Sequence, residues 1–261
     1  MDRTPTFDDG AAYERFMGRW SRAAGEAFLE WIRPSSGGRW LDVGCGGGAF
    51  TELVLARCSP AAVCAVDPAR TQINHARAQP VGKRAEFRVA DAEKLPFPDA
   101  SFDIVASALV INFIPDRPTA LLEMRRVARA GGLVAGYVWD FAGERSVMSP
   151  MRLAMQRMGT QPPPSAGAED STLERLDTLF RQAGLSNIVT KPIDISVTYP
   201  DFDDFWRAQT PGFNPLTQAI AALPHEARAR MADTVKEAIA APDGSIAYSA
   251  RANAIMARVP N

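Results

Sequence analysis

The chain has 261 residues, 46% of them hydrophobic and 23% charged, which suits a globular protein with one large α/β domain or a core plus a smaller cap. A formal net charge of −1 excludes a global basic field of the kind that attracts nucleic acid or an anionic membrane. No apolar run approaches the roughly 18 residues of a spanning helix, and the N-terminus lacks an apolar leader. We therefore expect a cytoplasmic protein with no membrane span and no nucleic-acid partner.

The few cysteines and histidines argue against a disulfide framework and against a metal site. The three cysteines, Cys45, Cys58 and Cys64, form no CxxC pair, which favours a reducing compartment over a disulfide framework. His75 and His225 are the two histidines, both in polar helical surroundings, so we expect surface positions for them and no metal site.

The first predicted element is an amphipathic helix over residues 11–32, because aromatic and small apolar residues recur there at three- and four-residue spacings. Short apolar runs then alternate with helical patterns. The predicted strands are 39–43, 62–66, 85–89, 102–107 and 133–138, and the predicted helices are 50–58, 69–78 and 118–128. Strands that alternate with helices indicate a parallel, doubly wound sheet with right-handed crossovers.

The pattern loosens after Trp139. A proline-rich loop over 159–170, a helix over 172–183 ended by Gly184, and a long strand over 188–199 come next. Helical sequence over 201–240, interrupted by prolines, precedes a final strand over 246–259. We expect four parts, in chain order: an N-terminal cap helix at 1–36, an α/β core at 37–200, a helical lid at 201–243 and the final strand of the core at 244–261.

A glycine-rich turn joins the first core strand to its helix. The sequence Leu-Asp-Val-Gly-Cys-Gly-Gly-Gly over 41–48 places bare backbone where a ligand can approach it closely. Gly44, Gly46 and Ala49 also fit the dinucleotide fingerprint. Sites for a dinucleotide and sites for an adenosyl sulfonium both place an acid after the second strand, which is Asp67 in this chain. At this point a nicotinamide cofactor and an adenosyl sulfonium both remain open.

Further motifs follow in order. Asp42-x-Gly-x-Gly-x-Gly48, Asp67, Asp91-Ala92, the segment 102–116 and the segment 126–133 resemble the motifs of the class I S-adenosylmethionine-dependent methyltransferases, particularly the ubiquinone/menaquinone-biosynthesis-like, type 11 subgroup. The resemblance covers residues 39–138. It implies a Rossmann-like, mostly parallel seven-stranded sheet with an antiparallel last strand, an N-terminal helix, a helical lid and S-adenosyl-L-methionine as cofactor.

The resemblance also assigns roles to residues. Asp67 would accept the ribose hydroxyls, Asp91 would meet the adenine amino group, and Asp42 would help orient the methionine ammonium. The full set expected at the cofactor is Tyr13, Asp42, Gly44, Cys45, Gly46, Gly48, Asp67, Pro68, Asp91, Ala92 and Ser107.

The acceptor is expected at the carboxyl ends of the strands, where open α/β sheets bind ligands. The candidates there are Asn112, Phe113, Trp139, Asp140 and Trp206. Many relatives carry a histidine near position 112, where this chain has Asn112 and Phe113. An imidazole base is therefore absent at this place, and no catalytic residue is assigned. An aromatic lid favours a small organic acceptor and direct in-line transfer through proximity and desolvation. A nicotinamide-dependent oxidoreductase and a catalytically idle cofactor-binding module remain as alternatives, and a homodimer stays open.

Overall fold

A mixed sheet organises the computed structural model, which describes residues 10–212, 214–241 and 245–261. Its strand order is β3-β2-β1-β4-β5-β7-β6, in which β7 runs antiparallel to both neighbours and β1 to β5 pair in parallel. The strands are β1 Arg39–Val43, β2 Ala62–Asp67, β3 Glu86–Val89, β4 Phe102–Ala108, β5 Ala128–Trp139, β6 Ser186–Tyr199 and β7 Ile246–Arg258. The predicted Rossmann-like fold with an antiparallel last strand is confirmed.

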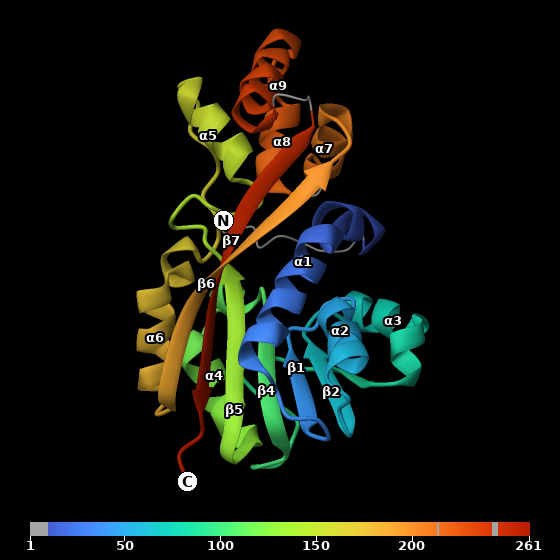
Figure 1. The fold of residues 1–261 in the computed structure, drawn as a ribbon, viewed down its shortest axis with the longest axis vertical. Helices are drawn as coiled ribbons and strands as arrows, with labels where there is room; N and C mark the ends of the chain where they lie inside the picture. The colour runs from blue at the N-terminus through green and yellow to red at the C-terminus, as the bar shows by residue number, and fades with distance from the viewer. Residues whose placement is uncertain (1–9, 213, 242–244) are drawn as a thin grey trace.

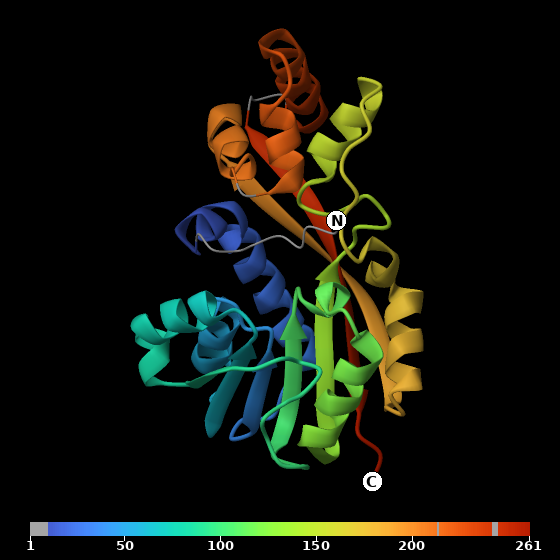
Figure 2. The same cartoon turned by 180° about the vertical axis from the view of Figure 1, so that it is seen from behind.

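Helices cover both faces of this sheet. One face carries α1, α2 and α3, and the other carries α4 and α6 (Figures 1 and 2). The helices are α1 Gly10–Ile32, α2 Ala49–Arg57, α3 Arg70–Ala78, α4 Arg117–Val127, α5 Ser149–Arg157, α6 Leu173–Gln182, α7 Phe202–Gln209, α8 Pro215–Ala221 and α9 His225–Ile239. Short 3₁₀ turns occur at Pro80–Lys83, Ile111–Phe113 and Ala168–Ser171. None of the described helices is long and apolar enough to cross a bilayer.

Two elements differ from the sequence prediction. Strand β5 begins at Ala128 rather than at residue 133, because the backbone at Gly131 and Gly132 continues the strand although glycines carry no apolar signal. Helix α5 was not predicted. Its Ser149-Pro150 start and its buried Met151, Ala154 and Met155 are a helical pattern too short to stand out beside the loop that follows.

The outer strands extend past the core. Residues 194–199 of β6 and 246–251 of β7 pair with each other beyond Trp139, the last residue of β5. This two-stranded ribbon leads to a group of helices, α5 and α7 to α9, above the sheet (Figure 1). Helix α5 packs against α9 although it precedes β6 in the chain. The division of the chain into a cap helix, an α/β core, a helical lid and a final core strand stays a prediction.

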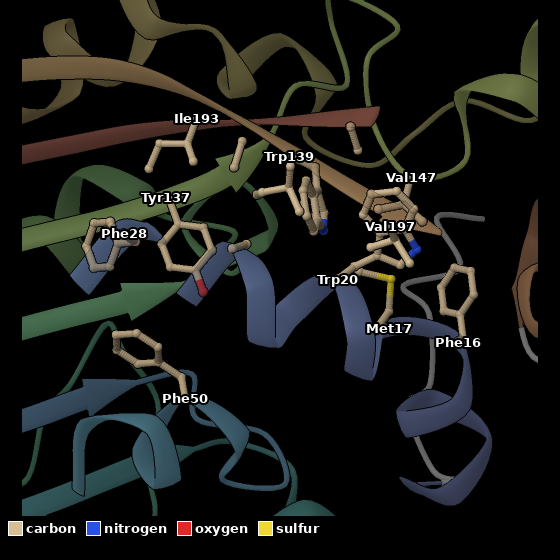
Figure 3. Packing of buried hydrophobic residues seen from close by; sticks show 14 of the residues in the cluster. Phe16, Met17, Trp20, Phe28, Phe50, Tyr137, Trp139, Val147, Ile193 and Val197 are labelled. Atoms are coloured by element: carbon tan, nitrogen blue, oxygen red, sulfur yellow. The ribbon is translucent and has the colours of Figure 1, made fainter. Parts of the chain in front are cut away.

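One continuous core connects the sheet to these upper helices. Figure 3 shows Phe16, Met17 and Trp20 of α1 on the same side as Trp139 of β5 and Val197 of β6. The Trp20 indole Nε1 donates to the Tyr199 hydroxyl at 3.0 Å, and Tyr199 lies at the end of β6. Helix α1 is thereby held across the carboxyl ends of the strands.

Candidate cofactor and acceptor site

The glycine turn is anchored to the end of β2. Gly44 and Cys45 both donate their backbone N–H to the Val66 carbonyl, at 2.8 and 2.9 Å, and Gly46 N donates to Asp67 Oδ2 at 2.9 Å. Gly44, Gly46 and Gly48 have φ of +78°, +51° and +89°, a region that favours glycine.

The glycines differ in what surrounds them. A Cβ at Gly44 would lie 2.4 Å from the Val110 Cγ1, so this glycine is required by packing against the segment after β4. A Cβ at Gly46 would meet no atom within 4 Å. A side chain at position 46 would therefore enter open space beside the turn.

Asp67 links the turn to the third strand. Its Oδ1 accepts from Ala69 N at 2.9 Å, and its carbonyl accepts from Ala90 N at 3.2 Å. Burial raises the pKa of Asp67, while the hydrogen bonds that its carboxylate accepts from Ala69 N and Gly46 N oppose the rise. Pro68, which follows, is exposed. The end of β2 thus touches both the glycine turn and the segment that leads to Asp91.

Asp91 and Ala92 stand at the rim of this region. The Asp91 side chain is exposed, and its Oδ1 accepts from Glu93 N at 3.0 Å. Ala92 and Leu95 are buried beside it, 8% and 4% exposed. An exposed carboxylate of this kind can accept a hydrogen bond from an exocyclic amino group of a ligand.

Among the carboxylic acids of the described residues, Asp42 has the most strongly raised pKa. The side chain lies at 1% exposure on β1, where Oδ2 accepts from Thr51 Oγ1 at 2.6 Å and Oδ1 finds no partner among the described residues. Burial, with the charge of Asp67 adding to it, raises the pKa of Asp42 to about 7. A buried carboxylate oxygen without a partner is costly unless a cation or donor reaches it.

The remaining expected cofactor residues have other surroundings. Ser107 is buried, and its hydroxyl donates to the Val43 carbonyl at 2.9 Å, which holds β4 against β1. Cys45 is 7% exposed, and burial raises the pKa of its thiol well above the ordinary value. The side chain of Tyr13 lies outside the described residues.

An apolar cavity of about 970 Å³, counted to its open mouth, lies beside this region. Its walls come from α1, the loop after β4, the end of β5, α5, the proline-rich loop and the start of α8. They consist of Phe16, Met17, Leu109, Phe113, Trp139, Phe141, residues 146–148, Arg152, residues 163–166 and residues 214–216.

Two of the predicted acceptor-side residues line this cavity. Phe113 and Trp139 do so, whereas Asp140 is buried and binds Gly143 N at 2.9 Å. Trp206 packs against Phe202 with tilted rings whose centroids are 5.7 Å apart, and it is not among the lining residues.

Asn112 is fully buried behind the cavity wall. Its Nδ2 lies 3.4 Å from the Ala166 carbonyl, its own carbonyl accepts from Arg117 Nη2 at 2.6 Å, and its Oδ1 has no partner among the described residues. The side chain ties the loop after β4 to the proline-rich loop.

Sequence reasoning missed Arg152 and most of the loop residues in these walls. Within the described residues no group of three His, Cys, Asp or Glu side chains could hold a metal ion. His75 and His225 are exposed, as predicted.

Comparison with known proteins adds family information to this geometry. Residues 41–136 match a methyltransferase domain family. Over 113 residues the chain is 39% identical to a malonyl-[acyl-carrier protein] O-methyltransferase of Erwinia pyrifoliae, covering 43% of this chain and 42% of that protein. Over 134 residues it is 36% identical to a ubiquinone/menaquinone biosynthesis C-methyltransferase of Geobacter sulfurreducens, covering 49% and 50%.

A solved structure shares the fold across the whole chain. The phosphoethanolamine N-methyltransferase 2 of Haemonchus contortus, in complex with S-adenosyl-L-methionine, matches with a TM-score of 0.61 at 19% identity, over 100% of this chain and 59% of that one. The chain matches about half the length or less of these two curated relatives. Residues 41–136 thus match a methyltransferase domain, and over about half of its length the chain is similar to methyltransferases that act on different acceptors.

Proposed function

We propose that the protein transfers a methyl group from S-adenosyl-L-methionine to a small organic acceptor by direct in-line displacement. The observation that carries this proposal is the convergence of three segments. The glycine turn bonds to Asp67, Asp67 bonds to the segment before Asp91, and the apolar cavity begins beside the same strand ends. We further propose that the protein acts in the cytoplasm, either alone or as a homodimer.

The chain's groups fit the cofactor. The space beside Gly46 would admit the methionine end of the cofactor, whose ammonium suits the unpartnered oxygen of Asp42. Asp67 would take the ribose hydroxyls, and Asp91 with Ala92 would take the adenine. Asp42 also argues against a nicotinamide dinucleotide, because its ionised form beneath the turn would repel a pyrophosphate.

When bound, S-adenosyl-L-methionine supplies a methyl group already activated on a sulfonium. The chain's contribution is then to align the acceptor, which is worth up to about 7–11 kcal/mol in favourable cases. Apolar walls such as Phe113, Trp139 and Leu216 exclude water from the transfer. None of the described cavity-lining side chains is an acid, a histidine, a lysine or a tyrosine, so we assign no general base.

Calorimetry with S-adenosylhomocysteine and with NAD tests the cofactor. We expect S-adenosylhomocysteine to bind and NAD to give no heat, and binding of NAD alone would overturn the proposal. Asp67→Ala should weaken S-adenosylhomocysteine binding at least about tenfold, since it removes charge-assisted hydrogen bonds to the ribose. Asp177→Ala on α6 is the matched control and should bind like the wild type. Methylation of members of an acceptor panel would separate an enzyme from an idle binding module.

A further inference from the structure

The acceptor cavity has one charged side chain on its wall. Among the described lining residues, Arg152 is the only cation and there is no anion. Its side chain is 13% exposed, so it is held away from water at the edge of an otherwise apolar space. Burying a guanidinium in such a place is costly unless its donors are satisfied.

Part of the Arg152 guanidinium is already occupied. Nε donates to the Glu144 carboxylate at 3.1 and 3.2 Å, and Nη1 donates to the Pro163 carbonyl at 2.6 Å. No hydrogen bond of Nη2 is found within the described residues. Glu144 and Pro163 therefore orient the guanidinium and leave one edge of it available.

The other polar side chains on this wall are neutral: Trp139, Ser146, Ser165 and Asn214. The Trp139 indole Nε1 is buried and has almost no surface open to the cavity, so we do not count it as a contact for a ligand. Arg152 is thus the charged donor on this wall, and its Nη2 edge calls for an acceptor oxygen in the ligand.

The cavity has two distinguishable ends. Leu109 and Phe113 come from the segment after β4, which contacts the glycine turn through Val110 and Gly44. Arg152 comes from α5, which packs against α9 in the upper group of helices (Figure 1). The charge therefore lies on the wall remote from the glycine turn.

We propose that the methyl acceptor is an apolar molecule with a carboxylate, and that Arg152 holds this carboxylate at the α5 wall while the methylated atom lies near Leu109 and Phe113. The inference rests on the proposed function, because it assumes that the cavity holds the acceptor. A single carboxylate suits the site better than a phosphate, since one arginine already paired with Glu144 offers too little positive charge for a dianion.

The test compares acids with their neutral amides on the full-length protein saturated with S-adenosylhomocysteine. The probe pairs are 1-naphthaleneacetate with 1-naphthaleneacetamide and decanoate with decanamide, measured by calorimetry. We expect the wild type to bind at least one acid about tenfold or more tightly than its amide, the low end for a hydrogen bond between charged groups. Arg152→Gln should abolish this preference, and Arg152→Lys should keep part of it.

The control is Arg157→Gln, an exposed arginine of the same helix that does not line the cavity, and it should keep the full preference. Glu144→Gln removes the negative charge that partly neutralises Arg152, and keeps an oxygen that can accept from Nε. It should therefore preserve or strengthen binding of the acid, even if Arg152→Gln fails to fold.

Three results would overturn the inference. The first is that neither acid binds more tightly than its amide, which includes the case that no probe binds. The second is an acid preference that survives in Arg152→Gln, and the third is tighter binding of 1-naphthyl phosphate than of 1-naphthaleneacetate. In each of these cases intact binding of S-adenosylhomocysteine would leave the proposed function standing. Loss of that binding in the wild type would instead refute the proposed function itself.

Discussion

The raised pKa of Asp42 predicts how the free energy of unfolding changes with pH, in both direction and magnitude. Burial raises its pKa from 3.8 to about 7, so the folded protein holds the proton more tightly than the unfolded chain. The stabilisation from this proton is fully present below pH 3.8 and is lost as the pH rises through about 7. A shift of about three pKa units corresponds to about 4 kcal/mol in all, of which about 3 kcal/mol falls between pH 5 and pH 8.

Asp42→Asn removes this titration while leaving an oxygen for the Thr51 hydroxyl. The new amide N–H has its own cost, which does not depend on pH, so the comparison is made across pH. Relative to the wild type, the variant should gain about 3 kcal/mol in its free energy of unfolding between pH 5 and pH 8. In a chain of this size this corresponds to a relative rise in Tm of roughly 6–12 °C.

The assay is thermal and urea unfolding of both proteins at the two pH values, with Asp177→Asn as a control that should follow the wild type. A difference between variant and wild type that is the same at pH 5 and pH 8 would refute the reasoning. Saturating S-adenosylhomocysteine should narrow the gap at pH 8, because its ammonium stabilises the ionised Asp42 and has no anion to meet in the variant. Calorimetry should show at least about tenfold weaker binding to Asp42→Asn.

Three further substitutions test the site and its support. Gly46→Val should fold with a backbone cost of about 1–2 kcal/mol and lose S-adenosylhomocysteine binding by calorimetry, since its side chain enters the open space; near-normal affinity would contradict this. Gly44→Ala should lower Tm through its contact with Val110, and adding Val110→Ala should recover part of the loss, whereas no recovery would remove that contact as the cause. Tyr199→Phe should cost about 1–3 kcal/mol in thermal unfolding, because it removes the acceptor for the Trp20 and Gln209 donors, yet leave cofactor affinity unchanged. An unchanged Tm would argue against that network.

The core of the fold could be predicted because each element carries its own signal. Strands β1 and β2 are short apolar runs bounded by turn residues, and the helices that follow them have amphipathic or apolar faces. Prolines at 211, 215 and 224 divide the predicted lid segment into α7, α8 and α9 at the predicted places. Where the signal was absent, at the glycines of β5 and in the short helix α5, the prediction was incomplete.

The proposed cofactor residues could be predicted from the sequence better than the proposed acceptor residues, for a physical reason. The proposed cofactor side is built from backbone N–H groups and acids at strand ends, so glycine and aspartate at fixed spacing carry it directly: Gly46 and Asp67 are 21 residues apart and share a hydrogen bond. The acceptor side is built from side chains of five or more separate segments, each of which looks locally like ordinary core. Most of these walls, including Arg152, come after the matched domain ends at residue 136. The part of the chain that would choose the acceptor is thus the part that the shared motifs do not cover, which explains how one cofactor site can serve many acceptors.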